Sequence, residues 1–147
     1  MLTDAGGWSN TLYSDTIQTA DVDGDGDDDL ITLDPSGAGL QLYSFAVTDA
    51  STGQGSWMAV ASSGPWTSAD GWSHTQYAST ITTGNIDDDP GAEVIGLGPN
   101  GLDAWGWDTS ANGGVGGWVE EVVPPTSGNP GVLSGSPWTD AAYYSTL

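Results

Sequence analysis

The chain of 147 residues contains no lysine and no arginine, although it carries 20 acidic residues and a formal net charge of −20. A protein without basic side chains cannot neutralise phosphate groups, so this composition excludes nucleic-acid binding. The same absence argues against docking on an anionic membrane surface and against an arginine clamp for carboxylate or phosphate substrates. Acidic residues that lie close together are therefore either solvated or compensated by a bound metal cation.

Cysteine is also absent, so the chain has no disulfide bond and no thiolate site, and redox chemistry does not indicate its compartment. The first ten residues lack the basic and apolar regions of a signal peptide, and no apolar run is long enough to cross a bilayer. Apolar spacing at helical period is missing, so helices are expected to be nearly absent. The eight tryptophans, five tyrosines and many aliphatic residues supply a core and argue against a disordered acidic tail.

The sequence repeats itself. Between positions 7–35 and 71–99, 13 of 29 aligned pairs are identical, and most of the remaining pairs are conservative. An internal repeat of this length indicates an architecture in which neighbouring units stack. We divide the chain into a first unit (1–70), a second unit (71–136) and the opening strand of a third repeat (137–147).

Each unit contains four short apolar segments bounded by glycine, proline, asparagine or aspartate turns. In the first unit, strands are predicted over residues 16–22, 29–33, 40–47 and 56–61. In the second unit, they are predicted over residues 80–86, 93–97, 102–107 and 117–123. Four antiparallel strands per unit predict an all-β protein made of β-propeller blades, two per chain. A self-contained β-sandwich of eight strands is the alternative.

The loop 21–29 carries an acidic residue at every second position. Calcium takes about six to eight oxygen ligands, and this spacing folds several of them onto one centre, with Gly26 permitting the sharp turn. An EF-hand would need a glutamate at position 12 of the loop, where Thr32 stands, and flanking helices. A solvated acidic turn is the other alternative. The predicted calcium ligands are the carboxylates of Asp21, Asp23, Asp25 and Asp29 and the backbone carbonyl of Asp27.

The equivalent loop of the second unit, 85–93, keeps oxygen-bearing residues at most of the corresponding positions. Pro90 replaces the glycine of the sharp turn, and proline cannot adopt a positive φ. A second and weaker calcium site is therefore expected. Its predicted ligands are Asn85, Asp87, Asp89, Gly91 and Glu93.

The segment 16–31, TIQTADVDGDGDDDLI, resembles the FG-GAP/VCBS repeats of integrin-like β-propellers, which carry calcium in the turn between the first two strands of a blade. The Gly-Trp opening of each unit, the segment GLGPNG at 96–101 and the partial terminal repeat resemble the Psathyrella velutina lectin-like propellers. The resemblance covers both units and the tail, and its acidic loop is the specific part. It implies a calcium-stabilised propeller with sugar sites between blades. The basic and histidine residues that follow Gly-Trp in the fungal lectin are missing here, so sugar specificity is not implied.

Three tryptophans lie beside turns and outside the predicted strands. A tryptophan on an exposed rim can stack on the face of a sugar, whereas a buried one fills the space between blades, and buried aromatic residues dominate packing energetics. Packing is the favoured interpretation and sugar binding the alternative. These residues are Trp8, Trp72 and Trp138.

No catalytic arrangement is evident, because the acidic residues concentrate in the two loops and the single histidine, His74, has no nucleophile motif with it. The sequence therefore predicts a binding protein and not an enzyme. The leading hypothesis is a carbohydrate-binding propeller that is secreted or displayed at the cell surface. The alternatives are a protein-interaction or structural propeller module, and a designed or excised fragment that assembles without a selected ligand.

Two blades would leave two apolar outer faces, marked by the alternating pairs Tyr43/Phe45 and Trp105/Trp107. Large exposed apolar faces usually mark an interface. A head-to-tail contact closes into a ring when the rotation divides evenly, so the chain is expected to form a trimer or a tetramer of itself. The segment 137–147 would then complete the last blade of its own chain or pair with the next subunit.

Overall fold

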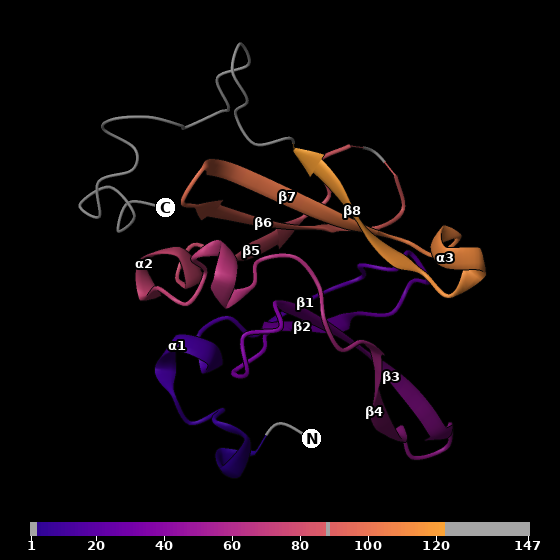
Figure 1. The fold of residues 1–147 in the computed structure, drawn as a ribbon. Helices are drawn as coiled ribbons and strands as arrows, with labels where there is room; N and C mark the ends of the chain where they lie inside the picture. Colours follow the sequence, from indigo (N-terminus) through magenta and orange to yellow (C-terminus); the bar gives the residue numbers. More distant parts are fainter. Residues whose placement is uncertain (1–2, 88, 123–147) are drawn as a thin grey trace.

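The computed structural model describes residues 3–87 and 89–122, and the predicted opening strand 137–147, with Trp138, lies outside them. The described strands form two four-stranded antiparallel sheets, each in sequence order. In Figure 1 the second sheet lies over the first, and the β3–β4 hairpin reaches away from it. The strands are β1 (Gln18–Ala20), β2 (Asp29–Leu33), β3 (Leu40–Asp49), β4 (Gln54–Ala61), β5 (Thr82–Gly84), β6 (Glu93–Gly98), β7 (Gly101–Asp108) and β8 (Gly117–Val122).

The all-β prediction with four strands in each half is confirmed, and helix is limited to short turns. Two of these are 3-10 turns and three are single α-turns, and none of the described helices is long or apolar enough to cross a membrane. The last α-turn contains left-handed residues at Asn112 and Gly113, with φ of 52° and 75°. The turns are η1 (Asp4–Gly6), α1 (Thr11–Ser14), η2 (Ser68–Asp70), α2 (Thr75–Ala78) and α3 (Ala111–Gly114).

The first strand of each sheet is shorter than predicted, because side chains replace part of the ladder. Thr16 Oγ1 donates to the carbonyl of Tyr13 at 2.7 Å and accepts the N–H of Leu33 at 3.0 Å. Thr80 makes the two corresponding contacts in the second sheet. A threonine hydroxyl that bonds to backbone in this way gives the chain an alternative to strand pairing.

The two sheets share details of strand pairing as well as strand order. The register between the third and fourth strands shifts immediately before Tyr43 in β3 and immediately before Trp105 in β7. Such an irregularity turns the following side chains and increases the local twist. Beyond the shift, aromatic residues face each other across both ladders, Phe45 with Trp57 and Trp107 with Trp118.

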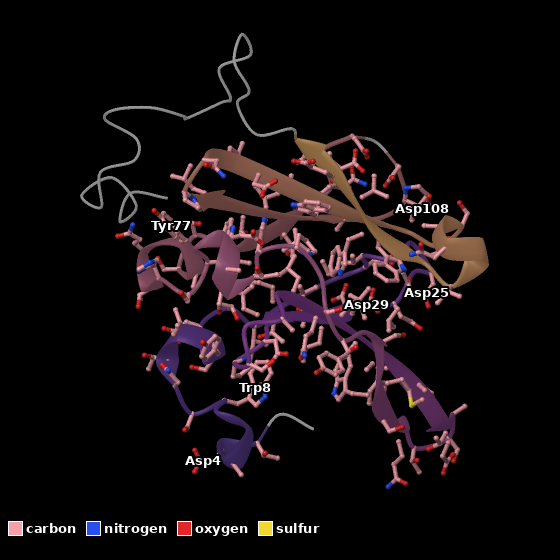
Figure 2. The ribbon with its side chains drawn as sticks, viewed as in Figure 1. Asp4, Trp8, Asp25, Asp29, Tyr77 and Asp108 are labelled. Carbon is pink, nitrogen blue, oxygen red and sulfur yellow. The ribbon has the colours of Figure 1, made fainter. Side chains whose placement is uncertain are left out.

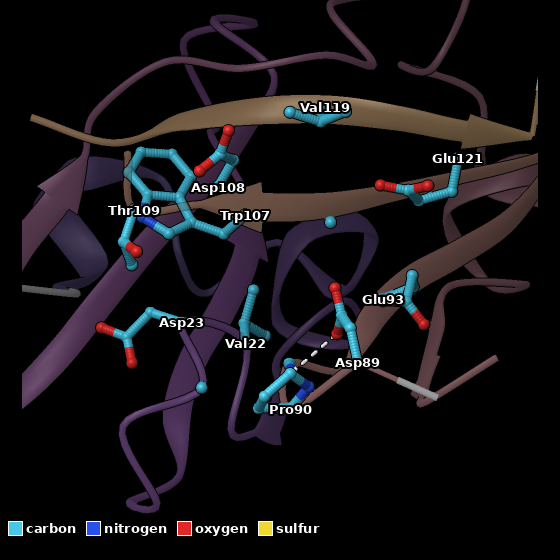
Figure 3. Close-up of a pocket in the computed structure, with 13 residues that line it drawn as sticks. Val22, Asp23, Asp89, Pro90, Glu93, Trp107, Asp108, Thr109, Val119 and Glu121 are labelled. Carbon is cyan, nitrogen blue, oxygen red and sulfur yellow. Dashed lines mark hydrogen bonds between the residues drawn. The ribbon is translucent and has the colours of Figure 1, made fainter. Parts of the chain in front are cut away.

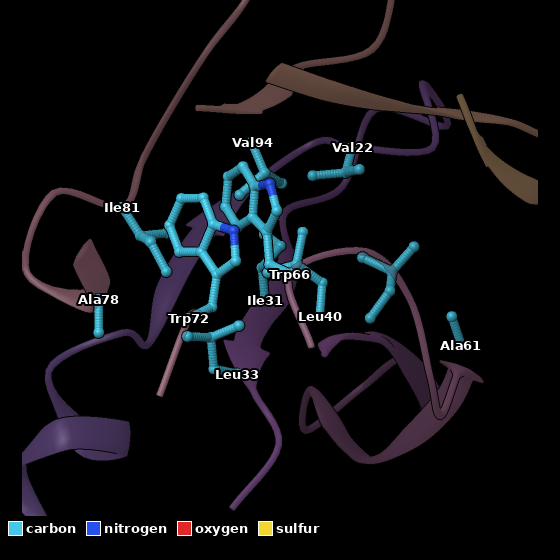
Figure 4. Packing of buried hydrophobic residues seen from close by; sticks show 11 residues of the cluster. Val22, Ile31, Leu33, Leu40, Ala61, Trp66, Trp72, Ala78, Ile81 and Val94 are labelled. Carbon is cyan, nitrogen blue, oxygen red and sulfur yellow. The ribbon is translucent and has the colours of Figure 1, made fainter. Parts of the chain in front are cut away.

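The core is centred on two stacked indole rings, those of Trp66 and Trp72, whose centroids are 4.2 Å apart. Figure 4 shows them among apolar residues from both sheets. Two glycines of β6 leave room for Trp72: a Cβ at Gly96 would lie 2.7 Å from its ring, and one at Gly98 would lie closer still. Glycine inside a strand commonly marks such a close approach. Both rings are buried, so this cluster is a packed core joining the sheets.

Candidate metal centre and neighbouring cavities

The loop between β1 and β2 folds its acidic side chains inward. Gly24 and Gly26 take left-handed φ values of 74° and 98°, which only glycine adopts without strain and which the predicted turn requires. Asp29 Oδ2 accepts the N–H of Val22 at 3.1 Å and that of Asp23 at 3.2 Å, so the last acid of the loop fixes its first half. One carboxylate oxygen from each of three residues then lies within 4.8 Å of the others, and these residues are Asp21, Asp23 and Asp29.

The electrostatics of this cluster fit a cation. Asp21 Oδ1 is buried and has no hydrogen-bond partner. Burial raises the pKa of Asp29 to about 6, with repulsion from Asp23 as the next cause. Burial and then the charge of Asp25 also raise the pKa of Asp23. Because the chain has no lysine or arginine, a metal ion is one cation that this cluster could hold to compensate its carboxylates.

The carboxylates of the two remaining acids predicted as ligands in the first loop lie outside the cluster. Asp25 and Asp27 are exposed, and Asp25 Oδ1 accepts the N–H of Asp27 at 2.9 Å. Figure 2 shows Asp25 and Asp29 in their places within the fold. The structure therefore brings together three of the four predicted carboxylate ligands, and the predicted role of the Asp27 carbonyl stays a prediction.

The loop between β5 and β6 gathers a second set of carboxylates, Asp87, Asp89 and Glu93, also within 4.8 Å of one another. Glu93 Oε2 accepts the N–H of Ile86 at 2.7 Å, as Asp29 does from Val22 in the first loop. Glu93 is buried, and burial is the main cause that raises its pKa. Both loops thus place a buried acid at their ninth position.

The other two predicted ligands of the second loop contact each other. The amide nitrogen of Asn85 donates to the carbonyl of Gly91 at 2.9 Å and also to the carbonyl of Asp89. Among the described residues of this loop, none has a positive φ. The proline therefore gives the second loop a different path from the first, as its lack of positive φ predicts.

The two loops touch each other directly. The N–H of Ala92 donates to the carbonyl of Asp21 at 2.7 Å, and a Cβ at Gly91 would lie 2.8 Å from the carbonyl oxygen of Val22. A cavity of about 460 Å³ lies between the loops and strands β7 and β8 (Figure 3). Its carboxylates are those of Asp23, Asp89, Glu93, Asp108 and Glu121.

A second cavity, of about 270 Å³, has an aromatic wall formed by Trp66, Trp72 and Trp105. Trp66 has a positive φ of 66°, uncommon for a bulky residue, and its Nε1 donates to Asp103 Oδ2 at 2.6 Å. Burial raises the pKa of Asp103, and burial followed by repulsion from Asp103 raises that of Glu120. The cavity therefore combines indole rings with three carboxyl groups, those of Asp70, Asp103 and Glu120.

Sequence reasoning did not single out Trp66, Asp103 or Glu120 as residues of one cavity. In the alignment of the two units, Trp66 corresponds to a position before the first described residue. The first unit therefore offers no described counterpart with which Trp66 could be compared. The alternation of Asp103 with Trp105 along β7 is the signal that places these two side chains on one face.

The tryptophans considered as sugar platforms differ in their surroundings. Trp72 is only 4% exposed and stacks on Trp66, so it has the packing role that the sequence favours. Trp8 is half-buried on the N-terminal segment, well apart from Asp25 (Figure 2). Trp138 lies outside the described residues.

Comparison of the chain with protein-family models, with curated proteins and with solved structures gives no match. The resemblance to calcium-binding propeller repeats therefore stays a prediction from the sequence.

Proposed function

We propose that the chain is a calcium-stabilised β-propeller module, in which the two sheets are neighbouring blades and further copies of the chain complete the ring. The observation that carries the calcium assignment is the convergence of Asp21, Asp23 and Asp29 around a buried oxygen that has no partner. The shared strand order, aromatic pairing and register shift of the two sheets support their treatment as equivalent blades.

Calcium suits the donor set better than other common metals. The clusters offer only carboxylate oxygens, and hard oxygen ligands select calcium, magnesium or manganese over zinc or copper. Magnesium requires a near-ideal octahedron, whereas calcium accepts irregular loops. Calcium sites of extracellular modules work at about 10⁻⁴–10⁻³ M, which is consistent with a secreted or surface-displayed protein.

Thermal unfolding with calcium and with a chelator tests the proposal. Binding to the folded state alone adds about 2.7 kcal/mol at a calcium concentration of 100 times Kd, so the midpoint should rise with calcium. Asp23→Asn should remove most of this rise. Asp28→Asn is the matched control, because it removes one charge from an exposed residue of the same loop outside the cluster. Equal midpoints with calcium and chelator would refute the calcium site.

The ligand of such a module is proposed to be a neutral carbohydrate, held against the half-buried indole of Trp105 with Asp103 and Glu120 as polar partners. Support comes from the combination of indole rings with carboxyl groups in one hollow. Flat aromatic faces suit the apolar face of a sugar, and a few polar groups set its orientation. No cationic side chain is present to recruit an acidic sugar.

Titration with hexoses and N-acetylhexosamines, followed by tryptophan fluorescence, tests this ligand class. Glu120→Ala should weaken binding, whereas Glu121→Ala should not, because consecutive residues of β8 point to opposite faces and Glu121 lines the other cavity. Equal effects of the two substitutions would move the site elsewhere. Absence of binding to every sugar would favour a protein-interaction or structural module, or a self-assembling fragment without a ligand.

A further inference from the structure

Corresponding positions in the two sheets differ sharply in exposure. Val22 and Ile86 are equivalent, since each donates its N–H to the buried acid at the ninth position of its loop. Val22 is 1% exposed, whereas Ile86 is 51% exposed. Val22 lies at the junction between the sheets, where a Cβ on Gly91 would approach its carbonyl. Ile86 has no following sheet to cover it among the described residues.

At the opposite end of the molecule, the exposed residue belongs to the first sheet and its covered counterpart to the second. Trp118 of β8 reaches across to the first unit, where a Cβ at Gly64 would lie 2.5 Å from its Nε1. Its counterpart Trp57 is 47% exposed and makes an edge-to-face contact with Phe45, with ring centroids 5.1 Å apart. Phe45, Trp57 and the exposed Val47 line a hollow of about 320 Å³.

The junction inside the chain indicates what fits this hollow. In the second sheet, Trp107 is the counterpart of Phe45, and it lines a cavity together with Val22 and Gly24 from the loop of the first sheet. The loop of one sheet thus lies against the aromatic strands of the next. The exposed loop at Ile86 and the exposed hollow at Trp57 are the two unpaired halves of the same contact.

We infer that the loop carrying Ile86 in one copy of the chain docks into the hollow formed by Phe45, Val47 and Trp57 in a second copy. This inference rests on the proposed treatment of the two sheets as neighbouring blades. The occupant is a second copy, because the chain itself carries the partner surface and repeats the contact at its internal junction. Such a contact is head-to-tail, so it extends until the ring closes.

The charges at this interface link docking to calcium. The hollow is bordered by Asp27 and Asp28, and the incoming loop carries Asp87 and Asp89. Like charges brought together without a cation repel each other, and this chain has no basic residue to offset them. Calcium in the loops reduces this repulsion, so association should be tighter with calcium than with a chelator.

Sedimentation equilibrium of the whole chain at micromolar concentrations tests the contact. With calcium, the wild type should exceed its monomer mass of 15.0 kDa. Trp57→Ser and Ile86→Ser should each weaken association at least about tenfold, as expected for the anchor residues of an interface. Val115→Ser is the matched control, because Val115 is 78% exposed but follows the α3 turn as its C-cap, outside both surfaces.

Mixing the two variants separates a head-to-tail contact from a symmetric one. The Trp57→Ser variant keeps an intact Ile86 loop, and the Ile86→Ser variant keeps an intact hollow, so an equimolar mixture should form dimers that neither variant forms alone. A mixture that stays monomeric would overturn the inference, as would a wild type that is monomeric at every concentration. The calcium-dependent rise in the unfolding midpoint would still stand in either case, so the calcium site is tested separately from the contact between copies.

Discussion

At the scale of single residues, the chain has to stabilise buried carboxylates without any basic side chain. In the loops, this is done with backbone N–H groups, as when Asp29 accepts from Val22 and Asp23. Away from the loops, Asp103 Oδ2 accepts the indole N–H of Trp66, and Trp105 and the backbone of Ala104 also favour its ionised form, but burial outweighs these contacts. Buried charge of this kind normally costs stability.

Replacement of Asp103 by asparagine should therefore stabilise the protein at neutral pH. Burial raises the folded-state pKa of Asp103, so its ionised form is disfavoured in the fold, and the cost disappears as pH falls through that pKa. Asparagine keeps an acceptor oxygen for Trp66 and carries no charge. We expect a midpoint a few degrees higher at about pH 7, since ~1 kcal/mol corresponds to about 2–4 °C in a chain of this size. The difference should shrink towards about pH 4.

Asp108→Asn is the control of opposite sign for this experiment. Side-chain and backbone hydrogen bonds from Ser110 lower the pKa of Asp108, so its ionised form is favoured in the fold. Its substitution should lower the midpoint at neutral pH, and the loss should fade as pH falls below the unfolded-state pKa. Thermal melts at the two pH values measure both effects. If the two substitutions changed the unfolding midpoint in the same direction at neutral pH, the assignment of opposite charge effects to Asp103 and Asp108 would be wrong.

At the scale of elements, the strands could be predicted closely because turn residues bound them on both sides. The starts of β1 and β5 could not, since the hydroxyls of Thr16 and Thr80 occupy ladder positions that a pattern of apolar residues does not reveal. The stacking of Trp66 on Trp72 could not be predicted either. It depends on the glycines of β6, which leave room for the ring of Trp72, and this role can be recognised only once the faces of the strand are known.

Adding a methyl group to β6 should test that packing. In Gly98→Ala the new Cβ would clash with the ring of Trp72, and overpacking of this kind costs about 1–3 kcal/mol. Gly84→Ala in β5 is the matched control, because nothing lies within 4 Å of its Cβ position and its φ is not positive. Urea unfolding at a fixed calcium concentration gives both free energies. Equal losses from the two substitutions would show that the tryptophan stack tolerates the added volume.

At the scale of the whole molecule, the loop spacing predicts that four carboxylates converge in the first loop, and three of them do so. The sequence could not reveal that the two loops contact each other through Ala92 and Asp21, because this depends on how the sheets meet. The contact brings both carboxylate clusters close to one cavity. Part of the acidic charge of the chain is therefore concentrated where the sheets join, and a cation bound there would affect both sheets.

General screening and specific binding should have separate effects on stability. Sodium chloride at about 0.1 M shortens the Debye length to about 10 Å and should raise the unfolding midpoint gradually by reducing self-repulsion. Calcium chloride at about 1 mM contributes too little ionic strength to screen, so any rise that it causes comes from binding.

The double variant Asp23→Asn with Glu93→Gln changes one buried or half-buried carboxylate in each cluster. It should keep the sodium response and lose the calcium response, and magnesium at the same concentration should raise the wild-type midpoint less than calcium does. A double variant that still responds to millimolar calcium would mean that the ion binds elsewhere, and equal responses to magnesium and calcium would mean that the clusters act only as diffuse negative charge.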